Sequence, residues 1–131
     1  MIISASYKTD IPAFYGDWFM NRLRAGSATV TNPWSGKPFT VDLRPEAVDG
    51  FVLWTRNIEP FERHLPELTA RAPVMVQYTV LGYPRALDLS VIAPERSVAA
   101  IHRLAERLGP RAVVWRYDPI VVSDLTPPAW H

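Results

Sequence analysis

The chain contains no cysteine among its 131 residues. This absence excludes disulfide bonds, thiolate ligands for metals and cysteine nucleophiles. It also excludes an iron–sulfur cluster held by this chain alone, because cysteine thiolates bind such clusters. We therefore expect neither a metal nor a cofactor in this chain.

An excess of charge and long apolar runs are also missing. The chain has 14 basic and 13 acidic residues and a formal net charge of +1, so no strong field favours nucleic acid or an anionic membrane. No apolar run approaches the roughly 20 residues of a membrane-spanning helix. Residues 1–10 have no basic segment ahead of an apolar one, unlike a signal peptide. We expect a cytoplasmic protein that binds neither nucleic acid nor membranes.

Several motifs of enzyme sites are absent as well. The three histidines, His64, His102 and His131, are far apart in the sequence, which argues against a metal site. The sequence contains no GxGxxG, GxxxxGK[ST] or GxSxG motif, which excludes two types of phosphate-binding loop and the nucleophile elbow.

The residues that are present favour a single α/β domain over residues 1–131, with 48% hydrophobic residues. Four apolar runs predict buried strands, and amphipathic segments between them predict helices. The strands are predicted at residues 2–6, 51–54, 74–79 and 112–115. The helices are predicted from the cap Asp10 to Gly26, from Asn57 or Glu59 through Leu68 with a break or a restart at Pro66, and at Pro94–Leu108.

Two shorter runs, residues 28–31 and 39–43, flank a turn-rich loop and predict a β-hairpin or an extended excursion. Three tryptophans, Trp18, Trp54 and Trp115, fall in apolar patterns and are predicted to pack in the core. In the helix at 94–108, the predicted core-facing stripe consists of Val98, Ile101, Leu104, Ala105 and Leu108.

Buried strands that alternate with helices predict a parallel sheet with right-handed crossovers. A complete eight-unit barrel needs about 250 residues, and this chain has about half. The predicted fold is therefore a partial TIM-barrel-like parallel sheet with flanking helices and one hairpin excursion. An open sheet, a half-barrel that pairs with another chain, and a truncated piece of a longer protein all stay open.

Polar residues follow each predicted strand, and the carboxyl ends of parallel strands lie at one edge, where active sites form. We expect these residues to meet there as a polar rim. The catalytic candidates are the charged residues Asp10, Arg56, Arg116 and Asp118. The candidates for ligand binding are Lys8, Thr9, Thr55, Asn57, Gln77, Thr79 and Tyr117. Each candidate also has a structural interpretation, as a helix cap, an ion pair or a satisfied buried group.

Several long motifs suggest a family. They are residues 3–6, 9–15, 18–23, 32–33, 54–57 and 115–119. Together they resemble the bacterial domain of unknown function numbered 1848, over nearly the whole chain. The resemblance implies a barrel-like protein about twice this length, with a C-terminal cysteine cluster like that of radical S-adenosylmethionine enzymes.

This sequence departs from the family pattern. Lys8 stands where the family usually has arginine, and Arg56 where it usually has lysine, which changes the geometry of any bidentate contact. The cysteine cluster is absent, so an iron–sulfur cluster is expected only in a longer family member.

Three hypotheses follow. The chain could be the N-terminal, substrate-contacting half of a barrel enzyme that has no redox chemistry alone. It could be a non-catalytic module that binds a small anionic ligand at the polar rim. It could also be a half-barrel that forms a homo-oligomer through its open sheet edge.

Overall fold

The main sheet has four parallel strands in sequential order. The computed structural model describes residues 1–5 and 8–131. The strands are β1 (Ile2–Ala5), β4 (Gly50–Thr55), β5 (Val74–Thr79) and β6 (Val113–Arg116), and they lie side by side in that order. This confirms the predicted parallel α/β sheet, although the sheet is open and not a closed barrel. Ser6, which the prediction included in the first strand, lies outside the described residues.

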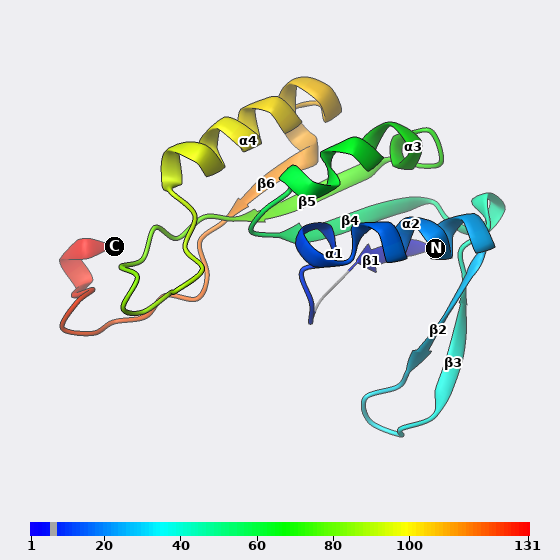
Figure 1. Ribbon diagram of the computed structural model, residues 1–131, viewed down its shortest axis with the longest axis horizontal. Coiled ribbons are helices and arrows are strands. Elements are labelled where there is room, and N and C mark those ends of the chain that lie inside the picture. Colours follow the sequence, from blue (N-terminus) through cyan, green and yellow to red (C-terminus); the bar gives the residue numbers. More distant parts are fainter. Residues whose placement is uncertain (6–7) are drawn as a thin grey trace.

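All the helices associated with this sheet lie over the same face of it (Figure 1). They are α1 (Ile11–Phe14), α2 (Gly16–Ala25), the 3₁₀ helix η2 (Glu59–His64), α3 (Leu65–Thr69) and α4 (Pro94–Leu108). Short 3₁₀ turns occupy η1 (Pro45–Ala47), η3 (Pro110–Ala112) and η4 (Pro128–Trp130). Among the residues that the structure describes, no helix is long and apolar enough to cross a membrane.

The helix ends follow the local sequence. Asp10 caps α1 by accepting a hydrogen bond from the backbone N–H of Ala13. The predicted single helix is interrupted at Tyr15, which separates α1 from α2. Gly26 ends α2 with a φ of 75°, a left-handed conformation that glycine adopts at little cost. Pro66 lies in the first turn of α3, so the predicted restart at this proline is confirmed.

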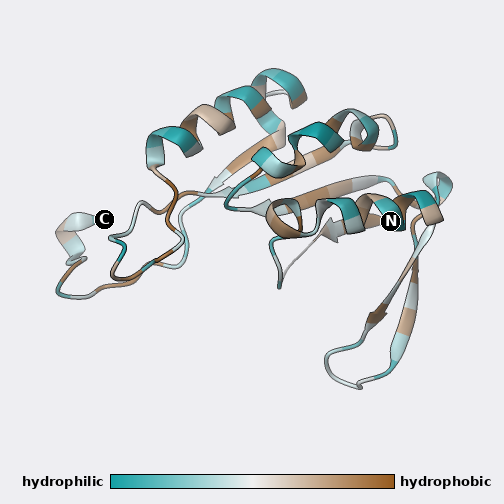
Figure 2. Cartoon of the chain, in the orientation of Figure 1, coloured by the Kyte–Doolittle hydropathy of each residue, from teal (hydrophilic) through white to brown (hydrophobic). Residues whose placement is uncertain are grey.

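The core lies between the helices and the covered face of the sheet. Strand side chains alternate between the two faces, and Phe51, Leu53, Val76 and Tyr78 face the helices and are fully buried. The ring of Phe19 on α2 meets that of Phe51 edge to face, with centroids 6.1 Å apart. Brown apolar segments of β4 and β5 pass beneath the helices in Figure 2.

The strands were predicted to be buried, and the structure confirms this for the side chains of β4 and β5 that face the helices, while those on the opposite face are half-buried or exposed. The prediction of core tryptophans is also wrong, for a different reason at each position. Trp115 is 63% exposed on an edge strand, Trp18 is also exposed, and Trp54 lies on the uncovered face. In α4 the buried stripe is Ser97, Ala100 and Leu104, while Val98 of the predicted stripe is exposed.

A separate two-stranded sheet extends away from the main sheet (Figure 1). Its strands, β2 (Ser27–Thr31) and β3 (Pro38–Asp42), pair antiparallel with Thr29 opposite Thr40, which confirms the hairpin. The Asn32 side-chain oxygen accepts hydrogen bonds from the backbone N–H groups of Trp34 and Ser35 and so shapes the connecting loop.

Beyond the carboxyl ends of β5 and β6, residues 80–93 and 117–131 pack together, and we call them the outer lobe (Figure 1). The Tyr83 hydroxyl donates to the carbonyl of Pro119 at 2.7 Å and accepts from the N–H of Val121 at 2.9 Å. The ring of Trp130 stacks on that of Tyr83 with centroids 5.1 Å apart. The hydroxyl of buried Thr126 donates to the carbonyl of Val121.

Adjacent residues of β4 test which face holds the core. Replacing Leu53 by alanine should lower the free energy of unfolding by about 2–5 kcal/mol, because it leaves a cavity under the helices. Replacing Val52, which faces away from the helices, by alanine should lower the free energy of unfolding by less than about 1 kcal/mol. Urea denaturation of both variants measures the difference. Equal losses would mean that both faces of β4 are packed.

Candidate functional site

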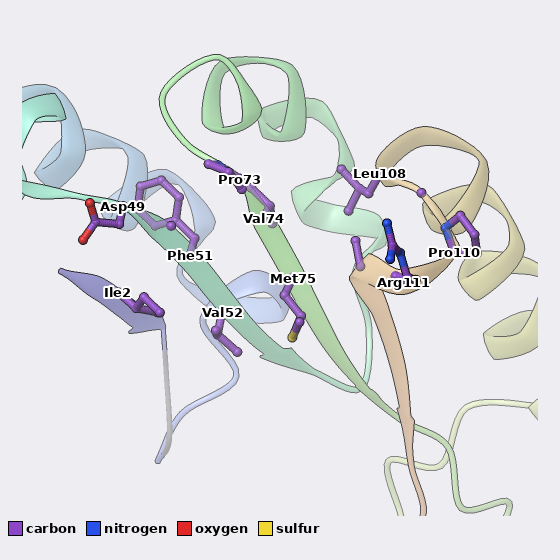
Figure 3. Close-up of a pocket in the computed structure, with 13 residues that line it drawn as sticks. Ile2, Asp49, Phe51, Val52, Pro73, Val74, Met75, Leu108, Pro110 and Arg111 are labelled. Carbon is purple, nitrogen blue, oxygen red and sulfur yellow. The ribbon is translucent and has the colours of Figure 1, made fainter.

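The face of the main sheet opposite the helices changes in polarity along the strands. We call this the open face, and its residues are Ile2, Ser4, Val52, Trp54, Met75, Gln77, Thr79, Val114 and Arg116. Ile2, Val52 and Met75 lie towards the amino ends of their strands, near the pocket drawn in Figure 3. The polar residues lie towards the carboxyl ends. The open face therefore has an apolar floor and a polar rim at the end where barrel ligands bind.

All four strands of the main sheet contribute a residue to a cluster on the rim. The guanidinium carbon of Arg116 lies 4.6 Å from the centroid of the Trp54 ring, a cation–π contact. The Trp54 indole N–H donates to the hydroxyl oxygen of Ser4 at 2.8 Å. Gln77 lies beside Trp54 in the strand register. We call Ser4, Trp54, Gln77 and Arg116 the platform.

Gln77 can offer its amide to another group. Within the described residues, its side-chain N–H donates to the sulfur of Met75 at 3.6 Å, and thioether sulfur is a weak acceptor. Thr79, the next open-face residue of β5, pairs in register with Arg116. Of the two predicted ligand-binding residues of β5, Gln77 therefore lies within the platform and Thr79 lies beside it.

Asp10 connects two elements far apart in the sequence. One carboxylate oxygen accepts from the backbone N–H of Ala13 at 3.0 Å, and the other accepts from that of Arg56 at 2.8 Å. Both oxygens are thus engaged with the backbone, and the carboxylate ties the start of α1 to the end of β4. A catalytic role for Asp10 stays a prediction, while its capping role is confirmed.

The Arg56 side chain is held by a residue that sequence patterns did not indicate. Its guanidinium forms an ion pair with Asp88 of the outer lobe. The Asp88 carboxylate also accepts from the N–H of Ser90 at 3.1 Å, and its side chain is only 14% exposed. The hydrogen bond from Arg56 holds the pKa of Asp88 below its ordinary value. Asp88 lies in an irregular segment, so no periodic pattern could have identified it.

Thr55 and Asn57 make local contacts. The hydroxyl of buried Thr55 accepts from the N–H of Asn57 at 2.9 Å, and the Asn57 side chain accepts from the N–H of Glu59 at 3.2 Å. These bonds shape the turn that leads into η2, as expected of residues near a helix start. Lys8 and Thr9 are exposed between β1 and Asp10.

The residues after β6 lie at the same end of the sheet. Arg116 forms an ion pair with Asp118, whose side chain is 52% exposed. The Tyr117 hydroxyl lies 2.6 Å from Nδ1 of His131, while Nε2 of that histidine lies 3.1 Å from the carbonyl oxygen of Val121. His131 thus fastens the chain end to the rim, a contact that its position in an aperiodic tail did not reveal.

Pockets lie at both ends of the main sheet. A pocket of about 560 Å³ lies at the amino ends of the strands, between Phe51, Met75 and Leu108 (Figure 3). It is mainly apolar and lies at the opposite end of the sheet from the platform. The cavity beside Arg56, Thr79 and Ser97 measures only about 10 Å³, which is at the lower limit for holding one water molecule. A further pocket of about 410 Å³ lies at the carboxyl end of the sheet on the side of α4, and its lining includes Ile101, Trp115 and Tyr117.

The side chains of this chain do not fit an iron–sulfur cluster. The chain has no cysteine to supply thiolate ligands. Within the described residues, no group of three or more histidine, aspartate and glutamate side chains could hold a metal ion.

A four-stranded parallel sheet with flanking helices and a separate antiparallel hairpin places the chain in the α/β class of proteins. Within it, the chain belongs to the family described as a domain of unknown function (DUF1848), whose sequence model matches residues 2–131. The resemblance inferred from the motifs is confirmed. No curated protein and no solved structure matches the chain.

The role of Asp10 as the acceptor of two backbone hydrogen bonds can be tested by mutation. Asp10→Ala should lower the free energy of unfolding by about 2 kcal/mol, because it removes a helix cap and a second acceptor of a backbone N–H. Asp10→Asn, which keeps one oxygen acceptor, should cost less. Denaturant titration with exposed Asp124→Ala as the control checks both. A loss for Asp10→Ala no larger than that of the control would contradict the structural role.

Proposed function

We propose that the chain is the substrate-contacting part of a barrel-type enzyme and binds a small anionic ligand at the platform. The observation that carries this proposal is the position of Arg116 on the open face, where its guanidinium stacks on Trp54 at the carboxyl end of the sheet. Active sites of parallel α/β barrels form at this end.

The groups around Arg116 suit recognition of an oxyanion. A guanidinium presents a planar fork of donors that matches a carboxylate or phosphate. Stacking on Trp54 restricts its movement, so less freedom would be lost on binding. The amide of Gln77 and the hydroxyls of Ser4 and Thr79 could orient the rest of the ligand.

The proposed contribution is binding and orientation. The Asp10 oxygens both accept backbone hydrogen bonds, and Arg56 is paired with an almost buried carboxylate. Within the described residues, the platform itself contains no acid paired with a base. In an enzyme of this architecture, these residues would therefore position the substrate for groups supplied by another part of the site.

A non-catalytic, self-assembling half-barrel is the second candidate, and the open face favours it. Strands β1 and β6 form the two edges of the sheet, and Val114 of β6 lies on the open face with exposed apolar neighbours. Edge strands with unpaired backbone groups pair readily with other chains. A second copy could place its β1 beside β6 and complete eight parallel strands.

Binding of a small anion tests the first candidate. Isothermal titration with phosphate, sulfate and succinate should detect binding in the millimolar range, and Arg116→Gln should weaken it at least about tenfold. The matched control is Arg111→Gln, an exposed arginine at the other end of β6. Equal binding by both variants would rule out the platform as the anion site.

Sedimentation velocity tests the second candidate. The chain should self-associate at micromolar concentration, and Val114→Glu should shift it towards monomer by placing a charge on the open face. The control is Leu89→Glu, an exposed apolar residue of the outer lobe. A monomeric parent chain would eliminate this candidate.

A further inference from the structure

The two arginines of the rim are paired with carboxylates in different ways. Asp88, the partner of Arg56, is only 14% exposed and also accepts a backbone hydrogen bond from Ser90. Asp118, the partner of Arg116, is 52% exposed, and in the described part of the chain Arg116 is its ion-pair partner. The first pair is built into the fold, whereas the second lies open to solvent.

An exposed pair is easily exchanged. Ion pairs between exposed side chains contribute little to stability, since water and salt compete with them. Asp118 is also two residues from Arg116 in the sequence, so it reaches the guanidinium by a short local link. The Asp118 carboxylate can leave Arg116 without disturbing an element of the fold.

Arg116, in contrast, has a second contact that does not depend on Asp118. Its guanidinium lies on the Trp54 ring, and the indole N–H of Trp54 is held by the Ser4 hydroxyl. The side chain of Arg116 is 30% exposed. Departure of the aspartate would leave a cation already oriented on the open face.

We propose that Asp118 is a built-in competitor for the ligand site, and that the ligand binds by replacing the Asp118 carboxylate on Arg116. This inference rests on the proposed function and deepens it by naming the part of the ligand that is recognised. That part is an oxyanion able to accept the N–H that Nη2 of Arg116 donates to Oδ2 of Asp118. A carboxylate and a phosphate ester share this chemistry.

Removing the charge of Asp118 should raise the affinity of the chain for an anion. Asp118→Asn should bind inorganic phosphate and succinate about two- to fivefold more tightly than the parent chain. In this variant the ligand no longer has to displace a charged carboxylate from Arg116, and an exposed ion pair of this kind contributes a free energy that corresponds to about that change in affinity. Isothermal titration at fixed, low ionic strength gives the dissociation constants. Comparison of the two probes shows which oxyanion is preferred.

Two controls separate this effect from a general change in charge. Asp124→Asn removes one negative charge from an exposed position of the same segment and should change the affinity much less. The double variant Arg116→Gln with Asp118→Asn should lose the gain, because the aspartate acts through Arg116. Thermal unfolding of each variant shows that it is folded.

The outcomes distinguish the two proposals. A gain for Asp118→Asn that disappears in the double variant supports the competitor. Binding by the parent chain that Arg116→Gln weakens but Asp118→Asn does not strengthen would overturn the competitor and leave the anion site standing. A gain that persists in the double variant would also overturn it. Absence of binding in both the parent chain and Asp118→Asn would overturn the anion site and the competitor together.

Discussion

The architecture depends on one constraint, which is that a sequential parallel sheet with right-handed crossovers places every helix on the same side. The strand order β1, β4, β5, β6 meets this condition. Each strand therefore has one face in a core that includes Leu53 and Tyr78, and another that no helix of the main sheet covers. The open face, with the platform at one end and apolar side chains at the other, is a direct result.

Much of this fold was predictable because its signals are local. Pro94 and Gly109 mark the ends of α4, and the predicted bounds of that helix agree with the structure. Hydrophobicity predicted part of the buried side of the same helix, because Leu104 is buried and Ile101 and Leu108 pack against the core. Small residues such as Ser97 and Ala100 face the sheet, where helix and strand approach closely, and the larger Val98 stays outside. Burial depends on which neighbours are present, and the sequence pattern does not state this.

The candidate site also has a part that was predictable from the sequence and a part that was not. Topology correctly brought Arg56 and Arg116 to one end of the sheet, because parallel strands share their direction. It could not foresee which carboxylate each arginine would meet. Asp88 comes from an irregular segment, and the stacking of Arg116 on Trp54 depends on the twist and register of three strands. Contacts made by loops and by long flexible side chains are set by the tertiary fold, so their prediction requires coordinates.

The outer lobe has a consequence for how the chain responds to stress. Its two segments are joined through Tyr83, which bonds to both Pro119 and Val121, and the ion pair of Asp88 with Arg56 ties the first segment to the rim. Residues so linked open and close as one cooperative unit, with a free energy distinct from that of the sheet. Local unfolding of the chain terminus would therefore also release the loop between β5 and α4, while the strands beneath remain paired.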